Sequence, residues 1–243
     1  GIASTPAIER FVSEVRFADA LRALSKKPPQ WEAPLKNSVD AVCDAISRRD
    51  IIAAEKLIMD AETRLDTLAR EAKSYVIHCI GHGHIDMNWL WSWPETVSIT
   101  HDTFLTVLAL MDEFPEFKYS QSQASVYEII RQYNPAMLKR IAKRVKEGRW
   151  DVTASQWVEG EKNLSSGEAL SRHLLYTRRY MKEIFKLEPE DITIDWEGDM
   201  FGHAATIPAI LNRGGVTRYY MCRSGEPVKP WIFRWTSPDG SNV

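Results

Sequence analysis

The chain has 243 residues, of which 44% are hydrophobic, and a formal net charge of −2 at pH 7. This composition is typical of a globular protein with one large domain, or with one domain and a smaller appendage. The near-neutral charge argues against a general affinity for nucleic acid or anionic membranes, and no apolar run reaches the roughly 18–20 residues of a membrane span. Three scattered cysteines and a start without a signal-peptide pattern predict a cytoplasmic protein.

Residues 1–73 are predicted to form a helical region. Apolar side chains recur at helical spacing in two stretches, which contain Val39, Val42, Cys43 and Ile46, and then Leu57, Ala61, Leu65 and Leu68. The segment Lys27-Pro28-Pro29 interrupts the pattern and separates these stretches from an earlier helix. We therefore expect a small helical appendage ahead of the main domain.

Residues 74–243 alternate between short β-like runs and helical runs. The predicted strands are residues 75–80, 117–121, 150–154, 192–196 and 217–221. Helix-start signals lie between them: Asn134 is a predicted N-cap before Pro135, and Ser165 forms a predicted capping box with Glu168. This alternation predicts an α/β fold with a parallel sheet covered by helices, either a β/α barrel or an open doubly wound sheet.

Polar and aromatic residues gather directly after each predicted strand. In chain order they are His82, His84 and Asp86; Gln121 and Gln123; Trp157, Glu159 and Glu161; Glu197 and Asp199; and Arg223. In both candidate architectures the active site lies at the carboxyl ends of the strands. We therefore expect these side chains to lie near one another and to form the functional site.

The first motif is Gly81-His82-Gly83-His84-Ile85-Asp86, at the end of the first predicted strand. The pair His84-x-Asp86 offers one imidazole and one carboxylate to the same point, a mixture of N and O ligands that suits Zn²⁺. The alternative is a turn whose histidines make only local hydrogen bonds. His-x-Asp pairs also occur in metal-dependent deacetylases and amidohydrolases, so the pair alone does not select a reaction.

The second motif runs from Asp195 through Glu197 to Asp199, at the end of the fourth predicted strand. A carboxylate in this position is suited to bind a metal, to act as a nucleophile, or to do both. The alternative for Asp199 is a purely structural one, in which its side chain caps the helix that carries Ile207.

Taken together, the two motifs resemble the signature segments of glycoside hydrolase family 38 α-mannosidases. The matching residues are His84-x-Asp86-x-x-Trp89, then Asp199-x-Phe201-Gly202-His203, and then Pro208. The run Trp157-Val158-Glu159, with Asn163-Leu164-x-Ser166-Gly167-Glu168 after it, is most similar to the cytosolic and bacterial branch. The resemblance extends from about residue 75 to the end of the chain. It implies a seven-stranded β/α-barrel catalytic domain, of which residues 74–243 would be the first part.

The resemblance also implies an activity: hydrolysis of terminal α-mannosidic linkages in oligosaccharides, with retention of configuration and one Zn²⁺ per catalytic domain. By matching position, His84, Asp86 and Asp199 would bind the zinc, and Asp199 would also be the nucleophile. The resemblance implies further roles around the sugar. Trp89 would lie under the ring, Phe201 would form a wall of the site, and Arg223 would lie near the nucleophile. Glu159 and Glu161 would shape the subsite that selects the linkage. The partner would be an α-mannoside oligosaccharide, and a homo-oligomer is compatible with the sequence.

Two departures from the family pattern bear on these expectations. Glu161 stands where the branch usually has aspartate, and Ser155-Gln156 replaces a glycine-rich pair, which affects the expected substrate preference. The family's remaining zinc-binding histidine, its acid/base carboxylate and its β-rich domains are expected beyond Val243, so we expect this piece alone to be inactive. The rival hypotheses are a zinc-dependent carbohydrate deacetylase and a non-catalytic sugar-binding fragment.

Overall fold

A computed structural model describes residues 5–24, 28–223 and 232–243. The chain divides into two compact units, Gly1–His78 and Cys79–Val243. In the described part of the chain, no helix is both long enough and apolar enough to cross a membrane. All three cysteines of the sequence are free and exposed.

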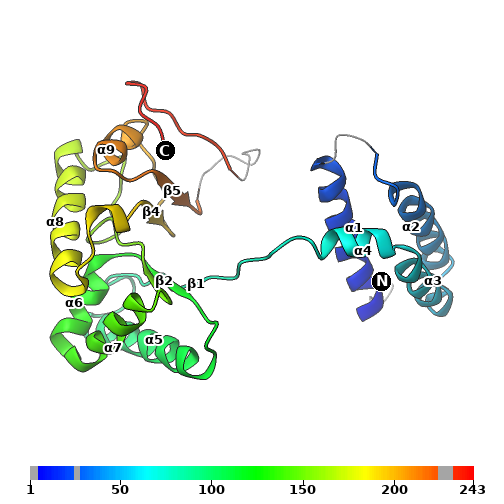
Figure 1. Ribbon diagram of the computed structural model, residues 1–243, viewed down its shortest axis with the longest axis horizontal. Helices are drawn as coiled ribbons and strands as arrows, with labels where there is room; N and C mark the ends of the chain where they lie inside the picture. Colours follow the sequence, from blue (N-terminus) through cyan, green and yellow to red (C-terminus); the bar gives the residue numbers. More distant parts are fainter. Residues whose placement is uncertain (1–4, 25–27, 224–231) are drawn as a thin grey trace. The chain divides into compact units, whose positions relative to one another are not determined.

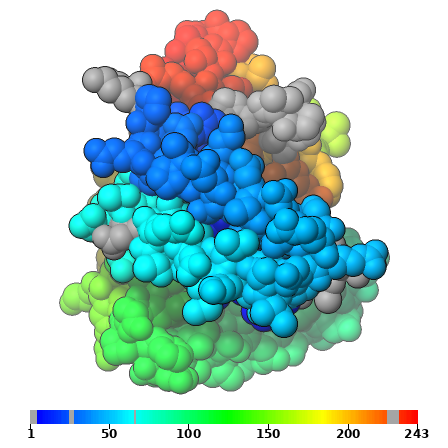
Figure 2. All heavy atoms as spheres, turned by 90° about the vertical axis from the view of Figure 1, so that its right-hand side faces the viewer, coloured from blue at the N-terminus to red at the C-terminus, as the bar shows by residue number. Residues whose placement is uncertain are grey.

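The first unit is helical and has a core of its own. Its elements are α1 (Pro6–Leu24), α2 (Glu32–Ser47), α3 (Ile51–Arg64) and α4 (Asp66–Ala72), coloured blue to cyan in Figures 1 and 2. Phe11, Trp31 and Ile58 are among the side chains buried between these helices. The Asp50 side chain accepts a hydrogen bond from the Ala53 backbone and caps the start of α3. The helical periodicity of the sequence thus corresponds to helices that pack on one another.

The second unit alternates helices with short parallel strands. In chain order it contains β1 (Gly81–His82), α5 (Trp93–Glu113), β2 (Tyr119–Gln121), α6 (Ala124–Tyr133), α7 (Pro135–Lys146), β3 (Trp150–Val152), α8 (Gly167–Phe185), the 3-10 helix η1 (Pro189–Asp191), β4 (Ile194–Glu197), α9 (Ile207–Arg213) and β5 (Arg218–Met221). The described strands form two parallel sheets, one ordered β1-β2-β3 and one that pairs β4 with β5. The predicted α/β class with short parallel strands is confirmed.

The main core lies between the first sheet and the helices packed on it (Figure 1). The Phe104 ring packs against Tyr127 and Trp150 in this core, with centroid distances of 5.9 and 5.0 Å. The Trp150 indole nitrogen donates a hydrogen bond of 3.0 Å to the hydroxyl of Tyr127. Burying these rings, which come from α5, α6 and β3, packs β3 against the two helices and so positions the loop that follows it.

Helix starts in this unit are set by side-chain caps. Asn134 caps α7 as predicted, because its side chain accepts a hydrogen bond from the Met137 backbone at 3.1 Å. The prediction for α8 is wrong by one residue: Ser166, and not Ser165, accepts from the Ala169 backbone. Two adjacent serines offer the same hydroxyl chemistry, so the sequence alone does not distinguish them.

The first predicted strand, residues 75–80, is the clearest error in the fold. This segment forms no strand, and Val76, Ile77 and Ile80 are 75%, 82% and 62% exposed. Pairing begins at Gly81, which lies opposite Tyr119 in the parallel register. Strand β2 begins only at Tyr119, and the residues before it belong to the turn that follows α5. Residues 75–80 therefore have no part of β2 beside them to pair with.

Candidate metal centre

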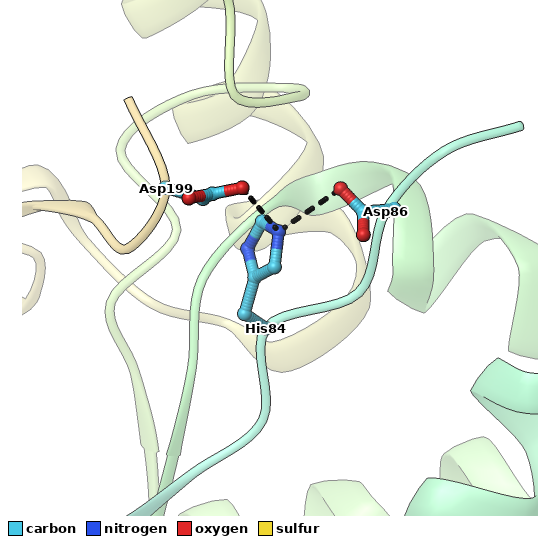
Figure 3. A group of neighbouring side chains, drawn as sticks. All are labelled: His84, Asp86 and Asp199. Carbon is cyan, nitrogen blue, oxygen red and sulfur yellow. Dashed lines mark hydrogen bonds and ion pairs between the residues drawn. The ribbon is translucent and has the colours of Figure 1, made fainter. Parts of the chain in front are cut away.

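Three side chains from the loops that follow β1 and β4 lie close together. His84 and Asp86 follow β1, and Asp199 follows β4. The Nε2 atom of His84 lies 3.2 Å from Oδ1 of Asp86 and 3.9 Å from Oδ2 of Asp199. Figure 3 shows the imidazole directed at both carboxylates. One nitrogen and two carboxylate oxygens therefore face a common point, with all ligand atoms within 4.8 Å of one another.

This donor set fits a zinc ion. Ligand atoms that share one zinc at roughly 2.0–2.2 Å lie about 3–4 Å from one another, which is close to the spacing around His84. The two structural alternatives do not describe the site. His84 contacts residues far away in sequence, so it is not part of a merely local turn. Asp199 is not the helix cap, because α9 begins at Ile207, directly after Thr206.

A third carboxylate, that of Glu159, contacts His84 and the backbone of Asp199. Its Oε1 atom is 3.3 Å from Nδ1 of His84 and accepts a hydrogen bond of 3.1 Å from the Gly198 backbone. Its Oε2 atom accepts a hydrogen bond of 3.2 Å from the Asp199 backbone. Both oxygens of Glu159, which is only 9% exposed at its side chain, are thus engaged within the protein.

The acidic surroundings favour positive charge at this point. The hydrogen bond to Glu159 raises the pKa of His84 to about 9, with a further contribution from Asp86, although burial acts in the opposite direction. Groups that stabilise an imidazolium stabilise a divalent cation in the same place for the same electrostatic reason. The charge of the surroundings and the three candidate ligands are therefore both compatible with zinc.

Asp199 is also held from the opposite side by Arg223, which follows β5. The guanidinium of Arg223 forms an ion pair with Oδ1 of Asp199 and lies 4.4 Å from the centre of the Phe201 ring. The His203 ring contacts the Tyr219 hydroxyl at 2.8 Å and the Arg223 carbonyl at 2.9 Å. His203, for which the sequence indicated no specific contact, thus supports the backbone that carries Arg223.

An open cavity of about 620 Å³ lies over the carboxylates. It is lined by the three candidate ligands together with Ile85, Met87, Trp89, Gln123, Val158, Glu159, Glu161, Met200, Phe201 and Arg223. Trp89 and Phe201 are 63% and 70% exposed, so neither ring belongs to the hydrophobic core. Exposed aromatic faces beside a polar floor are suited to bind a ligand with both apolar and hydroxyl-bearing faces.

Beneath the loop that carries Glu159 and Glu161 lies a buried ion-pair cluster that the sequence did not reveal. The ammonium group of Lys162 contacts carboxylate oxygens of both Asp195 and Glu197, and all three side chains are at most 4% exposed. Burial acts to lower the pKa of Lys162, but the two carboxylates hold it above its usual value, so the ammonium group is charged. Asp195 and Glu197 are two residues apart on β4, so their side chains point to the same face of the strand. Their ion pairs with Lys162 connect the loop to that strand.

Two further polar residues near the site, His82 and Gln123, make contacts with different parts of the protein. His82 is hydrogen-bonded to the hydroxyls of Ser120 and Ser122 and stacks on Trp196, and burial lowers its pKa to about 4. It does not contact the three candidate ligands. Gln123 connects the loop of Glu159 to the loop of His84 and Asp86, through hydrogen bonds with the Glu159 and Ile85 backbones. The sequence indicated it only by its position after the second predicted strand.

Comparison with known proteins identifies the family of the chain. Residues 74–243 match the family described as Glycosyl hydrolases family 38 N-terminal domain, and the chain therefore belongs to glycosyl hydrolase family 38. Alpha-mannosidase G of Dictyostelium discoideum is 32% identical over 91% of this chain and 20% of its own length. Alpha-mannosidase 2C1 of Homo sapiens is 33% identical over 70% of this chain and 16% of its own length. The matched part thus spans 20% and 16% of the length of these two relatives.

A solved structure supports the fold in the same way. The crystal structure of an alpha-mannosidase from Enterococcus faecalis V583 superposes on 68% of this chain with a TM-score of 0.59, at 19% sequence identity. The aligned part is 19% of that longer chain. The family resemblance found in the two motifs is confirmed, and the fold of the matching region is that of family members.

Proposed function

We propose that this chain is the first part of the catalytic region of a zinc-dependent α-mannosidase that hydrolyses terminal α-mannosidic linkages with retention of configuration. The observation that carries the proposal is the meeting of Asp199 with His84 and Asp86, from separate sheets, at the floor of an open cavity. Family membership supports the reaction class. In this proposal residues 1–73 are a helical region, and the two described sheets are parts of a seven-stranded β/α barrel.

Asp199 is the proposed nucleophile. In a retaining reaction one carboxylate oxygen bonds to the anomeric carbon while the bond to the leaving-group oxygen breaks and an acid protonates that oxygen. Water, deprotonated by the same group, then displaces the carboxylate and restores the free Asp199. The ion pair with Arg223 holds the Asp199 carboxylate in position for the first step. The acid is proposed to come from sequence beyond Val243, because no carboxyl group among the described residues is placed as clearly for that role.

His84, Asp86 and Asp199 are the residues proposed to hold the metal. When bound, zinc would contact sugar hydroxyls and help to distort the ring toward an oxocarbenium-like transition state. Trp89 and Phe201 are proposed to contact the sugar ring, and Glu161 to contact substrate from the neighbouring loop. The exposed positions of both rings at the cavity support this assignment.

The reaction class is tested by assaying the complete protein, loaded with zinc, on an aryl α-mannoside and on an acetylated sugar. We expect release of the aryl alcohol and no release of acetate. Release of acetate alone would instead assign the metal centre to deacetylation, in which zinc activates water. Activity on neither substrate, with zinc and mannose still bound, would favour a non-catalytic sugar-binding role.

Replacing Trp89 with alanine should weaken substrate binding and leave zinc binding unchanged. Loss of the ring face removes about 1.4 kcal/mol of apolar contact, so we expect KM for a mannoside to rise roughly 10-fold. Because Trp89 is 63% exposed, the free energy of unfolding should change by less than about 1 kcal/mol. Steady-state kinetics, metal analysis and denaturant unfolding measure the three quantities.

Trp150 provides the matched control, because its side chain is 1% exposed in the main core. Trp150→Ala should lower the free energy of unfolding by about 3–5 kcal/mol. A loss of this size in Trp89→Ala, together with an unchanged KM, would show that Trp89 is structural.

A further inference from the structure

Glu159 connects the two halves of the metal centre. His84 and Asp86 belong to the loop after β1, whereas Asp199 belongs to the loop after β4. The carboxylate of Glu159 accepts hydrogen bonds from the Gly198 and Asp199 backbones at 3.1 and 3.2 Å, and it lies 3.3 Å from Nδ1 of His84. A single buried side chain therefore contacts both segments that supply candidate ligands.

The contact with His84 has a specific consequence for metal binding. A neutral imidazole carries its proton on one ring nitrogen and its free electron pair on the other. A carboxylate beside Nδ1 retains a proton there, so Nε2 is the nitrogen that gives up its proton when a metal binds. Nε2 is the nitrogen that faces Asp86 and Asp199. Glu159 thus favours both the tautomer and the ring orientation that the site requires.

Glu159 is itself held in place by Gln123, which follows β2. Oε1 of Gln123 accepts a hydrogen bond of 3.3 Å from the Glu159 backbone, and its Nε2 donates one of 3.0 Å to the Ile85 carbonyl. Gln123 is 1% exposed and has a positive φ of 66°, which is uncommon and unfavourable for a residue other than glycine. The Gln123 amide joins the loop of Glu159 to the loop of His84 and Asp86. The contact between Glu159 and His84 joins the same two loops a second time.

We propose that Glu159 is a positioning residue of the metal centre, which orients His84 through Nδ1 and fixes the backbone of Asp199, and that it does not bind the substrate. The inference rests on the proposed zinc site. Both carboxylate oxygens already accept hydrogen bonds or face His84, and the side chain is 9% exposed. Oε1 is engaged by the Gly198 backbone and His84, and Oε2 by the Asp199 backbone, so the carboxylate is committed to contacts within the protein.

The test is the dissociation constant of Zn²⁺, measured on the complete protein by competition with a chelator, for the wild type and for Glu159→Gln. A glutamine has one acceptor oxygen and cannot accept from both backbone N–H groups while also accepting from Nδ1 of His84. We expect the dissociation constant to rise 10- to 100-fold. Glu159→Asp keeps the charge but is too short to reach both segments, and it should weaken zinc binding as well.

Glu161→Gln is the matched control, two residues away in the same cavity wall. Oε1 of Glu161 accepts from the Asn163 backbone within its own turn, so zinc affinity should change less than two-fold. The thermal midpoint of each metal-free variant shows whether the fold is intact. With the fold intact, an unchanged zinc affinity in both Glu159 variants would overturn the inference, as would a raised KM at unchanged zinc affinity.

The same experiment separates this inference from the proposed metal site. His84→Ala removes a candidate ligand and should abolish stoichiometric zinc binding. If the wild type binds zinc and His84→Ala does not, the metal site stands whatever the Glu159 variants show. A wild-type protein that binds no zinc would overturn the metal site and the role of Glu159 together.

Discussion

Replacing Asp199 with alanine is expected to lower kcat on an aryl α-mannoside by a factor on the order of 10⁴ or more. The substitution removes the atom that would form the covalent bond to the sugar, and losses of this size are typical when a nucleophile is deleted. Asp199→Asn keeps the shape of the side chain and should be equally inactive, because an amide oxygen is a poor nucleophile. A variant that kept a tenth of the wild-type kcat would contradict the assignment.

The Asp199 variants should also hold zinc more weakly. Oδ2 of Asp199 is one of the atoms that face Nε2 of His84, while Oδ1 is paired with Arg223. Alanine removes a ligand, whereas asparagine keeps a neutral oxygen in its place, so zinc should be lost most readily from Asp199→Ala. Metal analysis after dialysis against a weak chelator measures this order, and equal retention by wild type and Asp199→Ala would contradict it.

Replacing Lys162 with methionine is expected to cause a large loss of stability, about 3–5 kcal/mol in the free energy of unfolding. Methionine fills a similar volume but leaves the carboxylates of Asp195 and Glu197 buried without a positive partner. Breaking a buried ion pair on one side is costly because the remaining charge is neither hydrated nor compensated. Denaturant unfolding of the metal-free protein measures the difference.

Lys182 offers the matched control, since it forms a 2.8 Å ion pair with Glu188 but its side chain is 61% exposed. Lys182→Met should cost at most about 1 kcal/mol, because water compensates the charge that remains. Adding Asp195→Asn and Glu197→Gln to Lys162→Met should recover much of the lost stability. Similar small losses for Lys162→Met and Lys182→Met would show that the buried cluster contributes little.

The site is more predictable from the sequence than the fold around it. Parallel strands bring their carboxyl ends to one edge, so the rule that places active sites there groups His84, Asp86, Glu159 and Asp199 from the order of the sequence alone. These residues lie around a single cavity. The rule depends only on the order of strands and loops, and it does not require their ends to be placed accurately.

Features that depend on long-range burial are not predictable from local patterns. Lys162 lies in the polar run Glu161-Lys162-Asn163, which is typical of an exposed loop, yet it is 4% exposed because two carboxylates from β4 meet it. The apolar segment 75–80 is misleading in the opposite direction, since hydrophobic residues indicate a strand but do not supply its partner. In both cases the decisive neighbour is distant in sequence.

The most direct test of the proposed mechanism is covalent labelling of the complete, zinc-loaded protein with a fluorinated mannosyl fluoride that forms the glycosyl–enzyme but releases it slowly. Peptide mass mapping of the trapped protein identifies the labelled residue. A retaining reaction through this metal centre predicts one mannosyl group per catalytic site, attached to Asp199. Labelling of Glu197 in place of Asp199, or an active enzyme that forms its product without any trapped intermediate and with inverted configuration, would contradict the account.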